Sequence, residues 1–483
     1  QGDIREAMSS SLLLLSILPG LLALSNNHQE CLGKDCESLS SNRHRAERVT
    51  PERCTVLQNT QNAVYTINAK VGSPPTEFRL VADTGSNVLV IPGQNCKECK
   101  KANKRLYDFS ASSTSLKTRH ASRITYGSGT VEGPLIHDTV EAIGVKSKNQ
   151  SMLVMQHEAI QSFSNFDFDG IMGMGMPESS MGTKDQKAGD DRSFFAQAGV
   201  DAFTMCFDKG AKPNGVLKLG SKRNHTFNFE KVIGKVHWGV TLSGASTEGK
   251  QVDGVCTDGQ KCAVIVDSGT TLMMGPASHL VKIYSRLCDH LPECASMAQG
   301  TTDDATRSEL FMTILLTCPS SMASLPPLKF KLGESHISLG METYIMKAHS
   351  KELSMNNFMS GLTNSLNFGK YKAEVCVPAF MPMKMKSRRF GPVWIFGMPV
   401  MREYTVMFKR NHNNSGSPAV GFSKTKKCGG CGEEQMISDF TAKVVEKHEQ
   451  PSTILPYEPT RLSPIYIRKP SLSLYENSEE VRL

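Results

Sequence analysis

The stretch "LVADTGSNVLVIPG" (residues 80–93) contains one acidic side chain, Asp83, in an otherwise apolar run. The aliphatic residues on both sides of "DTGS" predict buried β-structure. Burying a lone carboxylate is unfavourable unless it is hydrogen-bonded or shares its charge with a partner. The stretch therefore predicts a buried acid with a second group beside it.

A second stretch, "CAVIVDSGTTLMMGP" (262–276), repeats this pattern and supplies the partner. An apolar strand is again followed by an acid, Asp267, and a short turn that contains glycine. If the two turns meet, like charges so close cannot both ionise, and the pair shares one proton. One carboxylate can then accept a proton from water while the other donates one to a carbonyl oxygen.

A single Asp-Thr-Gly sequence is more often only a turn, in which the aspartate bonds to its own backbone. Two such units, each behind an apolar strand, favour a paired site instead. Further motifs follow in order: "RITYGSGTVEGPL" (123–135), "FDGIMGMG" (168–175), "WIFGMPVMREYTVMF" (394–408) and "AVGFS" (419–423).

Together these motifs resemble the pepsin/cathepsin D-like aspartic endopeptidase family over roughly residues 60–425. The resemblance implies a mainly β, bilobal pepsin-like acid protease fold, with two related β lobes and an active-site cleft between them. Short β-type runs separated by Gly, Pro, Ser and Asn turns agree with a mostly β chain. A helix is expected near residues 276–291, where apolar positions recur at helical spacing.

The resemblance also implies roles for individual residues. Asp83 and Asp267 would be the catalytic pair that activates a water molecule. The backbone N–H groups of Gly85 and Gly269 would face the carboxylates. The hydroxyl groups would hold the pair: Thr84 and Ser268 by bonding to the opposite loop, and Ser86 and Thr270 by bonding the outer carboxylate oxygens.

The motif around Tyr126 and Gly127 resembles the flap hairpin that closes over an extended peptide in this family. Taken alone, a Tyr-Gly pair is more often part of an ordinary hairpin. Many relatives carry a tryptophan seven residues after the first catalytic aspartate, which bonds the flap tyrosine. Here that position is Val90, so the Tyr126 hydroxyl is expected to find another partner or water.

Neither a cofactor nor a metal is expected, because a carboxyl pair and water carry the chemistry. The 13 histidines form no His-x-x-x-His pair, which argues against zinc hydrolysis. The Met-rich run "GIMGMGMPESSMG" (170–182) is better explained by core packing than by metal binding. The net charge of +8 is modest for 483 residues and no basic stripe carries interleaved aromatics, so nucleic-acid binding is not expected.

Fourteen cysteines favour an oxidising compartment. Cys96/Cys99 and Cys428/Cys431 have the spacing of zinc knuckles, but they lie far apart and lack nearby histidines, so local disulfides are the preferred interpretation. Cys256 and Cys262 are further disulfide candidates. Candidate glycosylation sites, each weak alone, are Asn149, Asn224 and Asn413.

The N-terminal region indicates secretion. From Met8, a short apolar run ends in a small-residue pattern typical of signal peptidase sites, and it is too short to span a bilayer. The expected divisions are 1–7, non-native upstream residues; 8–25, a signal peptide; 26–60, a propeptide or a permanent extension tied by disulfides; 61–222, the N-terminal lobe; 223–425, the C-terminal lobe; and 426–483, a disordered tail.

These patterns predict a monomeric endopeptidase of the secretory pathway, secreted or lysosomal/vacuolar, without a membrane anchor. Its substrate would be a polypeptide in extended conformation. Two alternatives are open: a secreted binding protein on the same fold that has lost catalysis, and a convertase with a narrow processing role. The intact acid, hydroxyl and glycine positions of both loops argue against the first.

Overall fold

The computed structural model describes residues 53–60, 63–160, 163–176, 193–209, 214–220, 227–257, 259, 262–349, 374–412, 416–425, 427–431 and 479–480. All of them belong to one structural unit, residues 52–483. The expected signal peptide (8–25) and the expected boundary between the lobes (222) lie outside the described residues and stay predictions.

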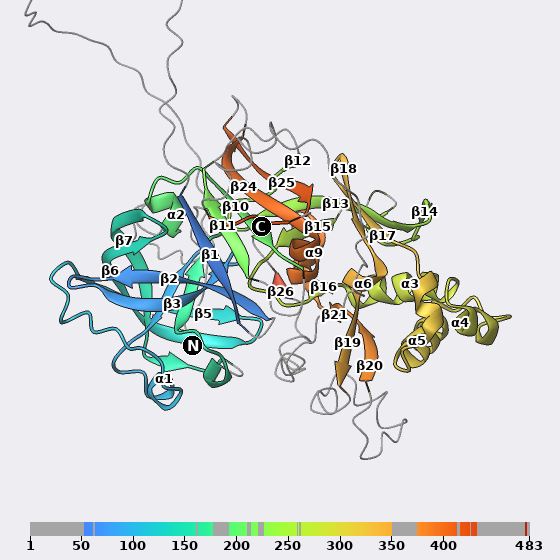
Figure 1. The fold of residues 1–483 in the computed structure, drawn as a ribbon, viewed down its shortest axis with the longest axis horizontal. Coiled ribbons are helices and arrows are strands. Elements are labelled where there is room, and N and C mark those ends of the chain that lie inside the picture. The colour runs from blue at the N-terminus through green and yellow to red at the C-terminus, as the bar shows by residue number, and fades with distance from the viewer. Residues whose placement is uncertain are drawn as a thin grey trace, which may run out of the picture. The chain divides into compact units, whose positions relative to one another are not determined.

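The larger sheet joins the strands of the first lobe to three strands, β12, β24 and β25, from the sequence range expected for the second lobe (Figure 1). Its spatial order is β12-β25-β24-β10-β11-β1-β2-β3-β9-β4-β7-β6-β5, with β8 beside β6. These strands are β1 (Arg53–Thr60), β2 (Val64–Val71), β3 (Thr76–Asp83), β4 (Leu89–Pro92), β5 (Leu116–Tyr126), β6 (Gly129–Ala142), β7 (Val145–Met155), β8 (His157–Glu158), β9 (Gly170–Gly173), β10 (Ala202–Phe207), β11 (Gly215–Leu219), β12 (Asn228–Lys231), β24 (Tyr404–His412) and β25 (Ser417–Lys424).

The second lobe is built on another sheet, in the order β18-β17-β13-β15-β23-β16-β21, with β14 beside β13 and the pair β22 and β26 at β23. A separate two-stranded sheet pairs β19 (Ile345–His349) antiparallel with β20 (Glu374–Pro378). The strands of the sheet are β13 (Gly239–Thr247), β14 (Lys250–Gln251), β15 (Cys262–Val266), β16 (Met273–Gly275), β17 (Leu328–Leu332), β18 (Ser335–Leu339), β21 (Phe380–Pro382), β22 (Met385–Ser387), β23 (Gly391–Phe396) and β26 (Glu479–Glu480).

Strand β17 shows why these segments form half-buried sheet. Its sequence, LKFKL, alternates buried apolar side chains with exposed lysines, and successive side chains of a strand point to opposite faces. Strand β15, CAVIV, lies between the antiparallel β13 and the parallel β23 and is instead buried along its whole length, as expected of a central strand that is covered on both faces.

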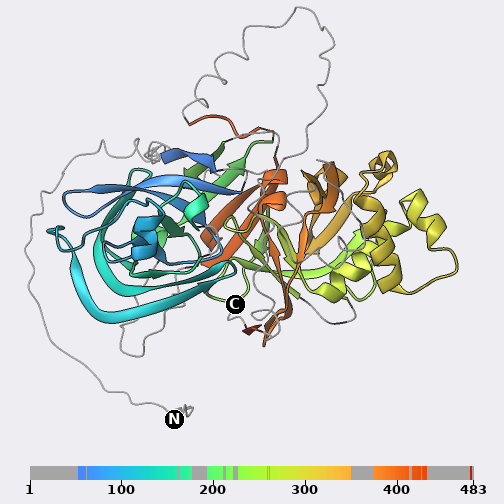
Figure 2. The same cartoon turned by 90° about the horizontal axis from the view of Figure 1, so that it is seen from below.

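Helices are short and mostly lie in the second lobe, where α3, α4 and α5 gather in both views (Figures 1 and 2). Tyr284 of α3 stacks on Phe311 of α5 at a centroid distance of 5.8 Å, so these two helices share a core. The described helices are α1 (Lys97–Lys101), α2 (Phe194–Gln197), α3 (Ala277–Cys288), α4 (Pro292–Met297), α5 (Asp304–Leu315), α6 (Met341–Tyr344) and α9 (Met398–Glu403), with 3-10 turns at Phe163–Asn165 and Ser320–Ser324.

The two lobes repeat one arrangement around each aspartate. Strand β3, which ends at Asp83, pairs in parallel with β9, and β15, which ends just before Asp267, pairs in parallel with β23. Two of the motifs that carried the family resemblance, at 168–175 and 394–408, include β9 and the end of β23. The fold is therefore the mainly β, bilobal pepsin-like fold that the motifs predict.

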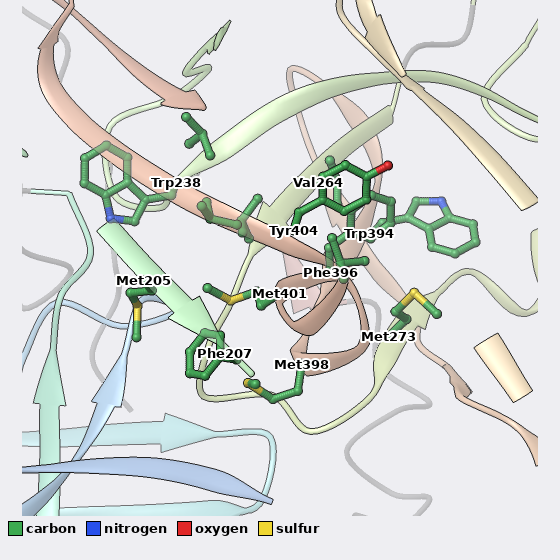
Figure 3. Packing of buried hydrophobic residues seen from close by; sticks show 14 of the residues in the cluster. Met205, Phe207, Trp238, Val264, Met273, Trp394, Phe396, Met398, Met401 and Tyr404 are labelled. Atoms are coloured by element: carbon green, nitrogen blue, oxygen red, sulfur yellow. The ribbon is translucent and has the colours of Figure 1, made fainter. Parts of the chain in front are cut away.

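Behind the second aspartate loop lies a dense apolar core, part of which is drawn in Figure 3. Val264 of β15, Phe396 of β23 and Met398 of α9 are each 0% exposed. Phe330 packs edge-on against Phe396 at 5.1 Å between ring centroids. Interiors packed in this way resist displacement, so the loop that carries Asp267 rests on a rigid base.

Six disulfides occur among the described residues, and they correct one expectation. Cys96 pairs with Cys99, and Cys256 with Cys262, but Cys428 and Cys431 do not pair with each other. The remaining bonds are Cys54–Cys431, Cys206–Cys428, Cys288–Cys294 and Cys318–Cys376. The Cys428/Cys431 segment passes the ends of β1 and β10, so each cysteine meets a strand cysteine instead of its near neighbour.

Strand pairing and two of these disulfides show how parts of two expected chain divisions are attached to the fold. Residues 53–60, expected to belong to a propeptide or an extension, form β1, which pairs with β11 and β2. Residues 427–431, at the start of the expected tail, are tied to β1 and β10 by two disulfides. Within that tail, residues 479–480 pair in parallel with β22.

Candidate active site

Asp83 is held at the end of β3 by groups from its own loop. Its carboxyl group accepts hydrogen bonds from the Gly85 N–H at 2.9 Å, on Oδ1, and from the Ser86 hydroxyl at 2.5 Å, on Oδ2. Its carbonyl oxygen accepts from the N–H of Met174, just after β9, at 2.7 Å. The side chain is only 6% exposed, so the aspartate is buried and its orientation is set on both oxygens.

Asp267 is held in the same way in the second lobe. Oδ1 accepts from the Gly269 N–H at 2.7 Å, and Oδ2 accepts from the Thr270 hydroxyl at 2.5 Å. The Asp267 N–H donates to the carbonyl oxygen of Phe396 on β23 at 3.0 Å. The residue is 8% exposed, and the two loops therefore present equivalent carboxyl groups.

Thr84 and Ser268 connect the two loops. The Thr84 N–H donates to Ser268 Oγ at 3.0 Å, and the Ser268 N–H donates to Thr84 Oγ1 at 2.9 Å. Each hydroxyl also donates to the opposite strand, Thr84 to the Val266 carbonyl at 2.9 Å and Ser268 to the Ala82 carbonyl at 2.6 Å. Both side chains are fully buried.

The two glycines let the loops approach each other. A Cβ atom added to Gly85 would lie 2.4 Å from Cγ of Asp267, and one added to Gly269 would lie 2.4 Å from Oδ1 of Asp83. Real Cβ atoms essentially never come this close to other heavy atoms. Each carboxyl group therefore lies against the glycine of the other loop.

Burial and pairing change the protonation of the site. Desolvation is the largest cause, followed by the neighbouring Asp267 carboxylate, and together they raise the pKa of Asp83 to about 8. The hydrogen bonds from Ser86 and Gly85 act in the opposite direction. Because the carboxyl groups interact, the proton that is retained belongs to the pair. Such a pair can hold one proton and one negative charge side by side.

The hairpin of β5 and β6 carries the expected flap. Tyr126 and Gly129 close it, with Gly127 at the turn. The Tyr126 hydroxyl is buried and makes no hydrogen bond within normal geometric limits to any described residue. Burial, and then the charge of Asp83, raise the pKa of the Tyr126 phenol, while Ser86 acts to lower it. The position of the family's tryptophan is filled by Val90, which is 0% exposed.

One contact to the site was not foreseen from the sequence. His237, just before β13, donates from Nδ1 to the carbonyl oxygen of Gly85 at 2.9 Å. The two residues lie 152 positions apart. A lone histidine between a lysine-containing turn and Trp238 gives no local signal of this contact.

Other predicted positions fall away from the dyad or outside the described residues. Asn149 is exposed on β7, with Oδ1 at 3.2 Å from Nδ1 of His137. Asn224 and Asn413 lie outside the described residues. In the described part of the chain, the cluster with metal-ligand geometry is Cys256, Cys262 and His279. Its cysteines form a disulfide, so they offer no thiolates to a metal.

Comparison with known proteins agrees with this geometry. Residues 64–420 match the family "Eukaryotic aspartyl protease", and the chain belongs to this family. Similar proteins include cathepsin D of Rattus norvegicus, 29% identical over 76% of this chain and 82% of the relative. Others are pepsin II-1 of Oryctolagus cuniculus (25% identical; 75% and 83% covered) and renin of Echis ocellatus (25%; 75% and 82%).

None of the helices in the described residues is long and apolar enough to cross a membrane.

Proposed function

We propose that this protein is an aspartic endopeptidase of the secretory pathway that hydrolyses peptide bonds with Asp83 and Asp267 acting through one water molecule. The observation that carries the proposal is the matched support of the two carboxyl groups. Each accepts one bond from a glycine N–H and one from a hydroxyl. A binding protein without catalysis would not require this duplicated hydrogen-bond set.

The chemistry follows from the shared proton. The ionised carboxylate takes a proton from water while the water oxygen attacks the peptide carbonyl carbon. At the same time, the protonated partner gives its proton to the carbonyl oxygen, which yields a tetrahedral diol. In the collapse of the diol, the ionised carboxylate takes a proton from one diol hydroxyl as the C=O bond re-forms and the C–N bond breaks, and the protonated partner gives its proton to the leaving nitrogen, so that the pair again holds one proton.

Membership of the family implies a polypeptide substrate. The hairpin that carries Tyr126 is proposed to close over an extended peptide, which would bind by main-chain pairing with side chains in alternating pockets. We propose a monomer, because each lobe of one chain supplies one aspartate. No cofactor enters the proposed reaction, since both proton transfers are made by carboxyl groups of the chain.

Six disulfides among the described residues support a location in an oxidising compartment. The apolar run after Met8 is the proposed signal peptide, and secreted, lysosomal or vacuolar destinations are all compatible with it. The arginine-containing segment after it is proposed to be a propeptide that shields the dyad.

The direct test is hydrolysis of acid-denatured globin by the purified protein and by two variants, Asp83→Asn and Asp267→Asn. Asparagine keeps the shape and most hydrogen bonds but cannot share a proton. We expect turnover by the wild type and none above background in either variant, while thermal unfolding shows that both variants fold. A pepstatin-type statine inhibitor should bind the wild type, because its hydroxyl group would replace the water. Substantial turnover by a pure variant would refute the mechanism.

A further inference from the structure

The short segment before and at the start of β13 contacts both aspartate loops. The Trp238 carbonyl accepts from the N–H of Val266, which directly precedes Asp267, at 3.1 Å. The Trp238 indole donates across to the Met174 carbonyl at 2.8 Å. Next to it, the His237 imidazole donates to the Gly85 carbonyl at 2.9 Å. A second-lobe segment therefore bonds to residues that position each catalytic acid.

The chemistry of this contact fixes the state of the imidazole. A carbonyl oxygen can only accept a hydrogen bond, so Nδ1 of His237 must carry the hydrogen. Burial lowers the pKa of His237, although the Gly85 carbonyl and the charge of Asp267 act in the opposite direction. In the neutral ring, the hydrogen therefore lies on Nδ1 and Nε2 is unprotonated.

The Gly85 carbonyl belongs to the peptide unit that joins Gly85 to Ser86. The residue on one side of this unit donates its N–H to Oδ1 of Asp83, and the residue on the other side donates its hydroxyl to Oδ2. Displacement of this unit would shift the Cα atoms of Gly85 and Ser86, and with them both donors, relative to the carboxylate. The same glycine also lies against the Asp267 carboxyl group, so its placement affects both acids.

We infer that His237 is a positioning residue for the dyad: by holding the Gly85 carbonyl from the second lobe, it fixes both groups that orient Asp83. The inference rests on the proposed protease function. His237 acts through the Gly85–Ser86 peptide and takes no part in proton transfer.

The test compares three variants on one peptide substrate. His237→Phe keeps a flat ring but removes the donor, whereas His237→Gln keeps a side-chain N–H that can reach a carbonyl. His336→Phe alters an exposed histidine on β18 and serves as a control. A small misplacement of a catalytic group can cost about 100-fold in rate. We therefore expect His237→Phe to lower kcat by about 10- to 100-fold with little change in KM, and His237→Gln to recover most of that loss.

Other outcomes overturn the inference. If His237→Phe keeps the wild-type kcat, or if the Phe and Gln variants lose kcat equally, the donor does not position the dyad. A change confined to KM would assign His237 to substrate binding instead. An inactive wild type would refute the proposed function itself, which is a different result from an active wild type with an unaffected variant.

A readout independent of turnover completes the test. One imidazole in the ¹⁵N spectrum of the wild type should be missing from the spectrum of His237→Phe, which assigns its signals to His237. Near neutral pH, the protonated nitrogen of this imidazole should be Nδ1. A signal that shows hydrogen on Nε2 alone would contradict the hydrogen bond to Gly85. Thermal unfolding of all variants separates a loss of fold from a loss of positioning.

Discussion

Thr84 and Ser268 exchange a reciprocal pair of hydrogen bonds across the two lobes, each giving its N–H to the hydroxyl oxygen of the other. Each hydroxyl then passes its own hydrogen to a strand carbonyl of the opposite lobe. Four buried bonds thus fix the separation of the loops that carry the two acids. The geometry of the dyad depends on this pair as much as on the acids themselves.

The first prediction concerns Thr84→Val, which replaces the hydroxyl by a methyl group of similar size. It leaves the N–H of Ser268 and the carbonyl of Val266 buried without these partners. Each unsatisfied buried group costs about 1–3 kcal/mol, so the free energy of unfolding should fall by at least that amount and kcat should drop. Thr84→Ser retains the hydroxyl and is the matched control. Equal stability of the Val and Ser variants, measured by denaturant unfolding, would contradict this reading of the contact.

The second prediction concerns Gly269→Ala. The added methyl group would lie 2.4 Å from Oδ1 of Asp83, so the loop or the acid must shift. Displacing a reacting group is expected to lower kcat/KM by at least about 100-fold. The circular dichroism spectrum should match that of the wild type and the six described disulfides should still form, because the clash is confined to the dyad. Wild-type activity in this variant would show that the two loops are farther apart in solution.

The third prediction links the dyad to stability. The pKa of Asp83 is raised from 3.8 to about 8 in the folded chain. Between these values the native state holds a proton that the unfolded state releases, so the free energy of unfolding falls as pH rises through this window. Asp83→Asn has no such titration. Its melting temperature relative to wild type should therefore increase from about pH 4 to pH 8.

The control for this measurement is Glu77→Gln, which removes an exposed carboxylate of β3. Its melting temperature should follow the pH dependence of the wild type. A difference between Asp83→Asn and wild type that stays constant from acid to neutral pH would mean that Asp83 ionises normally in the folded protein.

The fourth prediction concerns processing. The mature N-terminus should lie at or after Asn26, and acid exposure should produce a later one near residues 50–62 if the enzyme activates itself. Cys54 is bonded to Cys431, so a cut beyond Cys54 would leave the released piece attached until the disulfide is reduced. N-terminal sequencing with and without reductant distinguishes these cases. Secreted protein that begins at Gln1 or Met8 would contradict the signal peptide.

A feature could be predicted from the sequence when the residues that form it lie close together in the chain. The two acids were recognisable because each sits in a local pattern of strand, acid and glycine turn. The Thr84–Ser268 contact followed only from family resemblance, since nothing local joins them. His237 was missed because its bond to Gly85 depends on how the chain enters the second lobe. Cys428 and Cys431 have a spacing that fits a local bond, and their true partners depend on where β1 and β10 end.

The last prediction concerns the pH dependence of catalysis. Activity needs one proton shared by Asp83 and Asp267, so kcat/KM should follow a bell-shaped profile in acid, with an optimum at roughly pH 3–6. A second proton removes the general base and forms the acid limb. Loss of the shared proton removes the general acid and leaves two adjacent charges, which forms the alkaline limb. Because burial and pairing raise the pKa of Asp83, this limb should extend towards neutrality.

The Thr270 hydroxyl tests this account, because it donates to Oδ2 of Asp267 at 2.5 Å. A hydrogen bond to an ionised carboxylate favours the charged form. Thr270→Ala should therefore raise the apparent pKa values of the pair and move the optimum upward, whereas Thr270→Ser keeps the donor and should leave the optimum in place. Profiles of kcat/KM for the three proteins on one peptide decide the matter. A neutral optimum in the wild type, or an unchanged optimum in Thr270→Ala, would show that the hydroxyl does not set the protonation of the dyad.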